Sequence, residues 1–173
     1  KIMGDKFEKE VEELLDGYLL NLPFKIEKTS IGTQSGKFFD LAYKLYLFGD
    51  IKQPIHLKVE IKNHIPNLNE VTYFWRKTRE FRFGSVIPII IAPAFPSVVY
   101  KSFGDILYLV KYDKLKEFIK SIIHINTELR VAYKKGVEEG LKKDEVAPYK
   151  FMALGVEGMK QVVVGRLKLF NRL

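Results

Sequence analysis

Apolar and polar residues alternate almost without interruption through residues 55–63, IHLKVEIKN. Because successive side chains of a strand point to opposite faces, this alternation predicts a half-buried strand. The charged residues Glu60 and Lys62 fall on one face, two positions apart. The apolar face would carry Ile55, Leu57, Val59 and Ile61.

Helical and strand patterns follow one another along the rest of the chain. Apolar residues recur at helical spacing in some segments, and short apolar or aromatic runs bounded by Gly or Pro indicate strands in others. The predicted helices are residues 5–20, 68–83, 112–122 and 124–144. The predicted strands, besides 55–63, are residues 24–32, 38–48, 86–92 and 105–110. This order predicts an α/β fold with a mixed central β-sheet flanked by α-helices.

The two aromatic and alternating strands, 38–48 and 55–63, are expected to form a β-hairpin. A bend near residues 50–52 would place residue 40 across from the low sixties. Residues 86–92, VIPIIIA, are apolar without alternation, which is typical of a central strand covered on both faces.

The chain has 173 residues, enough for one domain with a sizeable core. We expect residues 1–122 to form this core. Residues 123–173 would form a helical or mixed C-terminal extension packed on it, for dimerisation or DNA contact. From about residue 145 the sequence fits either a strand or a helix.

Composition narrows the classes of function. The chain has no cysteine, which excludes disulfides, thiolate metal sites and a cysteine nucleophile. Its net charge of +8 favours polyanionic partners, nucleic acid first. No apolar run approaches the roughly 18 residues that cross a bilayer, and no secretory signal is visible, so we expect an intracellular, cytoplasmic protein without a membrane partner.

Asp40 interrupts an otherwise almost wholly apolar run, FFDLAYKLYLF. A carboxylate there is costly unless something pairs with it. A divalent cation held between Asp40 and Glu60 would be such a partner, and the carbonyl of Ile61 could add an oxygen ligand. The alternative is an ordinary cross-strand ion pair among Asp40, Glu60 and Lys62, which would contribute little.

An Asp on one strand followed by Glu-x-Lys on the next resembles the PD-(D/E)xK nuclease superfamily. In this chain the residues are Asp40 and Glu60-Ile61-Lys62. The chain most resembles archaeal Holliday junction resolvases, which begin with a Gly and a Glu four residues on, as Gly4 and Glu8 do here. They also carry a Gly/Ser-rich loop before the Asp. Phe39 departs from the motif, which has Pro at that place. The resemblance covers roughly residues 4–112 and implies a restriction-endonuclease-like fold.

The resemblance also implies a catalytic set of Glu8, Asp40, Glu60 and Lys62. Mg²⁺, for which Mn²⁺ would substitute, would be held by Asp40, Glu60 and the Ile61 carbonyl, helped by Glu8 directly or through water. The metal would activate a water molecule and polarise the phosphoryl oxygen. Lys62 would orient that water and stabilise charge on the phosphate. Glu12, one turn after Glu8, is the competing choice for the helix carboxylate.

Further polar residues could contact a nucleic-acid backbone. The loop GTQSG would use Thr33 and Ser35 together with Lys37, although it could equally be a turn without this role. The loop lacks the Lys-Ser/Thr ending of a P-loop, so we expect no nucleotide cofactor. The helix over residues 68–83 carries a basic cluster of Arg76, Lys77, Arg79 and Arg82, which is either a solvated face or a set of phosphate contacts. The cluster residues expected to contact phosphate are Arg76, Arg79 and Arg82.

The resulting hypothesis is a Mg²⁺-dependent DNA endonuclease, a phosphodiester hydrolase acting on branched DNA in the manner of a Holliday junction resolvase. Such an enzyme would be a homodimer, because two symmetric nicks need two active sites. A restriction-type or other DNA-processing nuclease is the alternative enzyme. A DNA-binding protein that keeps the nuclease fold without cutting, and a protein-interaction domain, are the non-enzymatic alternatives.

Overall fold

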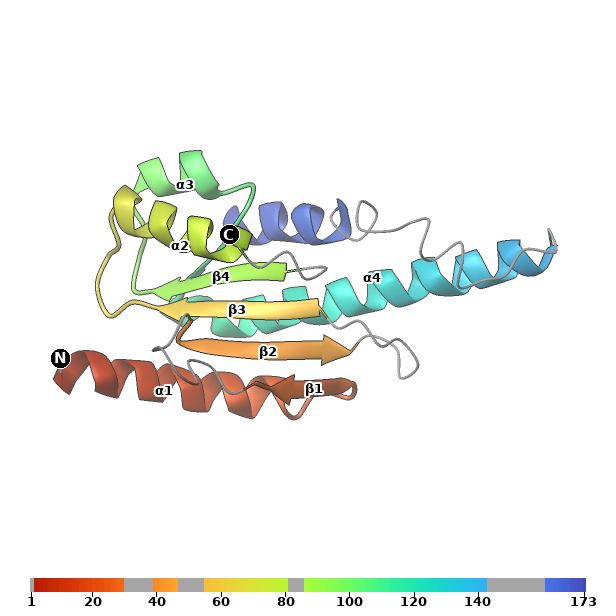
Figure 1. The fold of residues 1–173 in the computed structure, drawn as a ribbon, viewed down its shortest axis with the longest axis horizontal. Coiled ribbons are helices and arrows are strands. Elements are labelled where there is room, and N and C mark those ends of the chain that lie inside the picture. Colours follow the sequence, from red (N-terminus) through yellow and green to blue (C-terminus); the bar gives the residue numbers. More distant parts are fainter. Residues whose placement is uncertain (1, 30–38, 47–54, 81–85, 143–160) are drawn as a thin grey trace.

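A mixed β-sheet lies at the centre of the molecule (Figure 1). The computed structural model describes residues 2–29, 39–46, 55–80, 86–142 and 161–173. Within these ranges the sheet has five strands in the order β1-β2-β3-β4-β5. They are β1 (Lys25–Lys28), β2 (Leu41–Tyr46), β3 (Ile55–Ile61), β4 (Val86–Ala92) and β5 (Tyr108–Lys111). Neighbouring strands are antiparallel from β1 to β3 and parallel from β3 to β5, which confirms the expected α/β fold with a mixed sheet.

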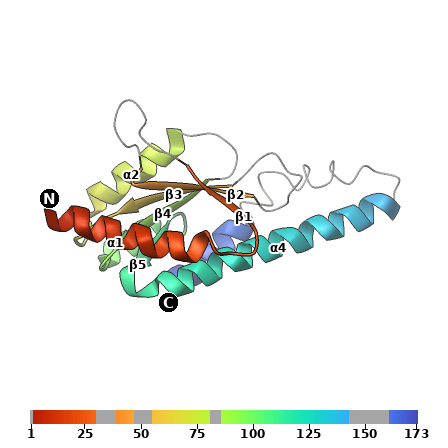
Figure 2. The ribbon, with the colours of Figure 1, turned by 90° about the horizontal axis from the view of Figure 1, so that it is seen from below.

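Helices cover both faces of this sheet, as Figure 2 shows. On one face lie α1 (Ile2–Leu19), α4 (Leu115–Lys142) and a C-terminal helix over residues 161–171. On the other lie α2 (Leu68–Glu80) and α3 (Ser97–Phe103). The buried residues accordingly form two clusters, one on each face of the sheet. No helix in the described ranges has the length and apolar character needed to cross a membrane.

The apolar residues of β3 and β4 are buried on the faces that the sequence pattern predicted. In β3 the odd-numbered residues 55–61 are buried in the cluster beneath α1 and α4. In β4, Ile89 and Ile91 join the same cluster, whereas Ile90 and Ala92 join the cluster beneath α2 and α3. β4 is therefore apolar at successive positions because both of its faces are covered.

The pairing of β2 with β3 agrees with the predicted hairpin, which placed residue 40 across from the low sixties. Leu41 pairs with Val59 and Tyr43 with Leu57 in the antiparallel ladder. Asp40 lies just before this ladder, beside the end of β3 that carries Glu60.

Several predicted boundaries need correction. Residues 112–122 and 124–144 were expected to be separate helices, but α4 runs unbroken from Leu115 to Lys142 after a 3₁₀ turn at Tyr112–Lys114. The expected domain boundary at residues 122 and 123 thus falls inside a helix. The strand expected over residues 105–110 begins at Tyr108, because the residues before it form the turn that ends α3.

Helix α3 was not predicted. It is a seven-residue helix that starts after Pro96 in a segment with a second proline, Pro93, and its apolar pattern is too short to be distinctive. The C-terminal tail, for which strand and helix were both open, is helical over residues 161–171.

Asn171 links the C-terminal helix to β5, which is the last strand of the sheet order. Its Oδ1 accepts a hydrogen bond from the Leu109 N–H at 3.0 Å, and its Nδ2 donates to the carbonyls of Gly104 at 2.8 Å and Leu107 at 2.6 Å. A strand at a sheet edge has backbone groups without a strand partner. The Asn171 amide bonds one such group, the Leu109 N–H of β5, and also two carbonyls of the turn before β5.

We expect Asn171→Ala to lower the free energy of unfolding by about 2 kcal/mol, because it removes the partners of three partly buried backbone groups. Urea denaturation followed by circular dichroism would measure the change. Arg172→Ala is the matched control, since Arg172 is exposed and its loss should cost no more than about 0.5 kcal/mol. Equal stability of the two variants would contradict this role for Asn171.

Candidate functional site

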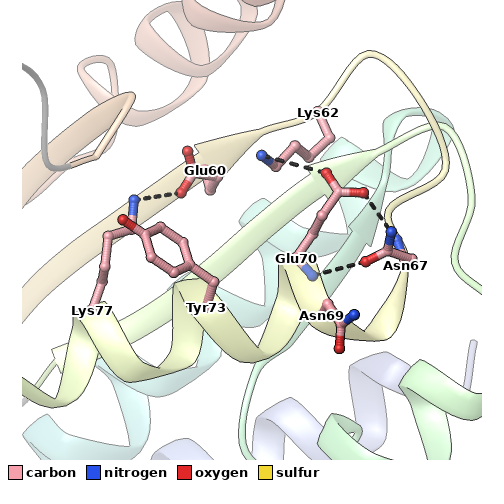
Figure 3. A pocket seen from close by; sticks show the side chains of 7 residues that line it. All are labelled: Glu60, Lys62, Asn67, Asn69, Glu70, Tyr73 and Lys77. Carbon is pink, nitrogen blue, oxygen red and sulfur yellow. Dashed lines mark hydrogen bonds and ion pairs between the residues drawn. The ribbon is translucent and has the colours of Figure 1, made fainter.

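A pocket lies where the carboxyl end of β3 faces α2 (Figure 3). Its volume is about 330 Å³. The residues around it carry carboxylate, ammonium and amide groups and one aromatic ring. The lining residues are Glu60, Lys62, Asn67, Asn69, Glu70, Tyr73 and Lys77.

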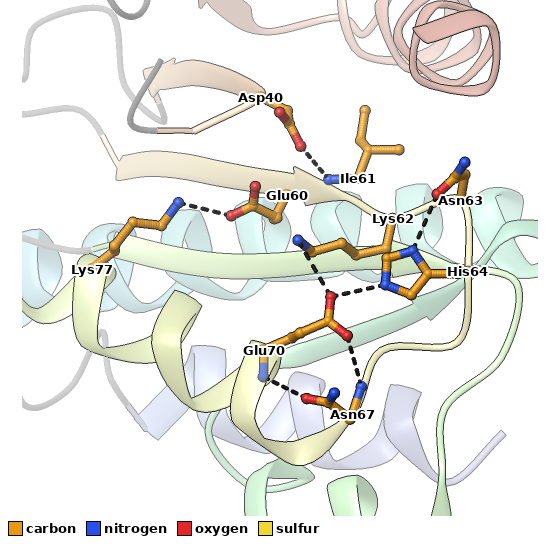
Figure 4. Close-up of polar contacts among 9 residues, drawn as sticks. All are labelled: Asp40, Glu60, Ile61, Lys62, Asn63, His64, Asn67, Glu70 and Lys77. Carbon is orange, nitrogen blue, oxygen red and sulfur yellow. Dashed lines mark hydrogen bonds and ion pairs between the residues drawn. The ribbon is translucent and has the colours of Figure 1, made fainter. Parts of the chain in front are cut away.

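Asp40 is fixed by a backbone hydrogen bond next to this pocket. The Ile61 N–H donates to Asp40 Oδ2 at 2.7 Å, as Figure 4 shows. Asp40 lies just before β2, where the ladder between β2 and β3 begins with Leu41 and Val59. The bond therefore holds the carboxylate against the strand segment that carries Glu60-Ile61-Lys62.

Glu60 is paired with a helix lysine. Lys77 Nζ donates to Glu60 Oε2 at 2.9 Å, and the two side chains are 15% and 14% exposed. Burial raises the pKa of Glu60, and the negative charge of Asp40 adds to this, although the bond from Lys77 works against both. The net pKa lies above its usual value, so the positive charge around Glu60 does not fully offset its burial and the repulsion from Asp40.

Lys62 is held near Glu70. Its Nζ lies 3.7 Å from Glu70 Oε2, and His64 Nε2 lies 2.8 Å from the same oxygen. The other oxygen, Oε1, accepts from the Asn67 N–H at 3.2 Å, while the Glu70 N–H donates to Asn67 Oδ1 at 2.9 Å. This reciprocal pair is a capping box that fixes the start of α2. Burial alone would raise the pKa of Glu70, but the bonds from His64 and Asn67 and the nearby charges lower it.

A row of basic residues continues from the site along the same face of the sheet. Lys44 of β2 pairs across the strands with His56 of β3, and Lys58 follows two residues later on that face. Burial lowers the pKa of His56, and the charges of Lys58 and Lys44 lower it further. The pKa of Lys58 is likewise lowered by burial and by Lys44. The lowered pKa values show that these basic groups lie close enough together to repel one another.

The structure brings together the residues of the expected motif. Asp40, Glu60, the Ile61 backbone and Lys62 all lie at the carboxyl end of β3 (Figure 4). Glu8 is half-buried on α1, whose first turns lie toward the same end of the sheet in Figure 1. Within the described ranges, however, no three acidic or histidine side chains form a metal-ligating group, so Glu8 does not complete one with Asp40 and Glu60.

The other predicted contacts have different outcomes. Glu12, the alternative to Glu8, is ion-paired with Lys28 of β1. Arg76 and Arg79 are exposed on α2, and the Arg79 guanidinium lies 4.8 Å from the centre of the Trp75 ring. The remaining candidates lie outside the described residues. They are Thr33, Ser35, Lys37 and Arg82.

Sequence reasoning missed Glu70, read His64 as solvent-facing, and named Lys77 only as a member of the basic cluster on the helix. A signal for Glu70 exists, because Asn67 and Glu70 have the spacing of a capping box. Glu70, Tyr73 and Lys77 also share one face of a helix by their spacing. That this face lies over Glu60 depends on the packing of α2 on the sheet, which periodicity alone does not give.

Comparison of the chain with protein-family models, curated proteins and solved structures finds no match. A function for this protein is therefore inferred from the chemistry and positions of its side chains.

The donor set of Asp40 and Glu60 fits a hard divalent cation. Carboxylate and backbone carbonyl oxygens are the ligands that Mg²⁺ prefers, and the Ile61 carbonyl belongs to the strand residue between Glu60 and Lys62. Figure 4 shows the Glu60 oxygen not bonded to Lys77 on the side of Asp40. The two like charges raise the energy of the ionised pair, which a cation between them would offset.

We expect Asp40→Ala to lower the free energy of unfolding by about 1–2 kcal/mol in EDTA, because the Ile61 N–H loses its acceptor. Asp40→Asn keeps an oxygen at that place and removes the repulsion with Glu60, so it should be at least as stable as the wild type. Urea denaturation of the three proteins would measure this order. Equal destabilisation by both substitutions would argue against the hydrogen bond.

We also expect His56 to make the fold less stable in acid. Because the folded state lowers the pKa of His56, the unfolded chain binds this proton more readily. The resulting loss of stability should develop as the pH falls through about 6.5, the ordinary value, towards 5. Thermal denaturation at pH 7.5 and pH 5 should show a smaller loss for His56→Gln than for the wild type. The exposed His124→Gln is the control, and equal losses in both variants would contradict the assignment.

Proposed function

We propose that this protein is a Mg²⁺-dependent DNA endonuclease of the PD-(D/E)xK type. The observation that carries the proposal is the convergence of Asp40 with Glu60-Ile61-Lys62, in which the Ile61 amide bonds the Asp40 carboxylate at 2.7 Å. Asp40 lies just before β2 and Glu60 lies in β3, the antiparallel neighbour of β2, which supports a cation shared by the two carboxylates. The order of α1, three antiparallel strands, α2 and a parallel β4 supports a restriction-endonuclease-like core.

Each residue has a role in this proposal. Asp40 and Glu60, with the Ile61 carbonyl, hold the cation. Mg²⁺ bound there supplies Lewis acidity towards water and towards a phosphate oxygen. Lys62 faces the same pocket as Glu60 and stabilises the negative charge that develops on the phosphate. Glu70 is a positioning residue that holds the Lys62 ammonium near the pocket.

The charge distribution supports a nucleic-acid substrate. Lys44, His56 and Lys58 lie in a row on the α2 face of the sheet, and Arg76 and Arg79 are exposed on α2 itself. A backbone bound along this face would meet positive charge on both sides of the pocket. Selectivity for branched DNA and a homodimeric assembly complete the proposal and depend on the resemblance to Holliday junction resolvases.

The test compares labelled four-way junctions with matched linear duplexes in the presence of Mg²⁺. We expect cleavage by the wild type, stronger on the junction, and a loss of about 100-fold or more in Asp40→Asn and in Lys62→Met. Lys116→Met, on the exposed face of α4, is a charge-matched control. EDTA should abolish cleavage.

Other outcomes would separate the alternatives. Cleavage of duplex as efficient as that of the junction would favour a restriction-type or other DNA-processing nuclease. Salt-sensitive DNA binding without cleavage of either substrate would favour a DNA-binding protein that keeps the fold. Undiminished cleavage by Asp40→Asn would refute the assigned site.

A further inference from the structure

The Lys77 ammonium lies among groups that attract a cation, namely a carboxylate and aromatic rings. Its Nζ donates to Glu60 Oε2 at 2.9 Å, and its side chain is 15% exposed. The same ammonium lies 5.3 Å from the ring centre of Phe39, 5.5 Å from that of Tyr73 and 5.9 Å from that of Phe74. An ammonium among aromatic rings and a carboxylate is held by cation–π attraction as well as by the ion pair.

This ammonium and a divalent cation would claim the same carboxylate. Two positive groups a few ångströms apart in a partly buried site repel each other strongly. The aromatic rings do not remove that repulsion, because they attract the ammonium without neutralising it. A cation bound by Glu60 and Asp40 is therefore expected to displace Lys77 from its bond to Glu60.

We propose that Lys77 is the resident counter-ion of Glu60, that it competes with the divalent cation, and that metal binding transfers its ammonium to the phosphate backbone of the substrate. This inference depends on the proposed metal site and deepens it. Lys77 lines the open pocket beside Lys62, and the four-carbon stem of a lysine lets its ammonium move several ångströms. Tyr73, which is 67% exposed, lines the pocket, and its ring would remain near the ammonium as it moves towards solvent.

The two pocket lysines are distinct in this respect. Lys62 lies 3.7 Å from Glu70, a carboxylate outside the proposed metal ligands, so metal binding leaves that pairing intact. Lys77 is paired with a proposed ligand itself. Lys77 alone of these two therefore couples metal binding to substrate binding. By thermodynamic linkage, the cation should strengthen nucleic-acid binding through Lys77, and nucleic acid should strengthen metal binding by the same factor.

The first experiment measures Mg²⁺ binding without nucleic acid, by calorimetry, with Mn²⁺ binding followed by electron paramagnetic resonance. We expect Lys77→Met and Lys77→Gln to bind the metal about 5- to 10-fold more tightly than the wild type. Lys77→Arg should stay close to the wild type because it keeps the competing charge. Lys116→Met is the control for loss of a distant positive charge, and Asp40→Asn should lose the binding.

The second experiment measures the transfer to phosphate in a Lys62→Met background, where the proposed mechanism leaves the metal ligands intact but slows cleavage. Fluorescence anisotropy with a labelled duplex, with and without Mg²⁺, gives the enhancement of DNA affinity by the metal. We expect this enhancement to be about 5-fold greater in the single variant Lys62→Met than in the double variant that also carries Lys77→Met.

The outcomes distinguish the two proposals. Wild-type metal binding that Asp40→Asn abolishes but Lys77→Met leaves unchanged or weakens would overturn the role of Lys77 and leave the metal site standing. Suppose that Lys77→Met binds the metal more tightly, but Mg²⁺ enhances DNA affinity equally in Lys62→Met and in the double variant. That result would overturn the transfer of the Lys77 ammonium to phosphate. Wild-type metal binding that is absent, or that survives Asp40→Asn, would overturn the proposed metal site and this inference with it.

Discussion

The hydrogen bond that the Ile61 amide donates to Asp40 fixes the geometry on which the candidate site depends. Sheet pairing sets the register of β2 and β3, but it does not set the direction of a carboxylate that lies just outside the ladder. The Ile61 amide does so with a backbone group that cannot change its rotamer. The main chain therefore holds Asp40 beside the end of β3 that carries Glu60, and the lysines around them are placed by side chains and by α2.

The charged groups of the site destabilise the folded state, because they are partly buried and lie near like charges. Largely buried Glu60 faces the charge of Asp40, and half-buried Lys58 faces that of Lys44. A chain selected for stability alone would replace these groups by apolar residues, since taking charge out of water is destabilising. Proteins retain such costs mostly at sites that bind or react with a charged partner. Both signs of charge are concentrated here on the α2 face of the sheet.

Hydrophobic periodicity predicted the strands that carry the site, but it failed for elements and contacts that depend on tertiary packing. The alternation of β3 and the unbroken apolar run of β4 predicted their bounds closely, and the expected hairpin placed Asp40 near Glu60. Helix α3 was missed because its short pattern lies among prolines, and α4 was divided because its charged second half looked like a new element. Lys77 was one of several basic residues on a helix, and only the packing of α2 singles it out.

The candidate site also has a consequence for the order in which the protein can assemble. All of its side chains come from residues 40–77, whereas β5 is secured by Asn171, 62 positions beyond Leu109 in the chain. Closing short loops costs less entropy than closing long ones, so contacts that are local in sequence can form earlier in folding. During synthesis the residues around Asp40 and Glu60 therefore leave the ribosome before Asn171, which bonds the edge strand β5, has been made.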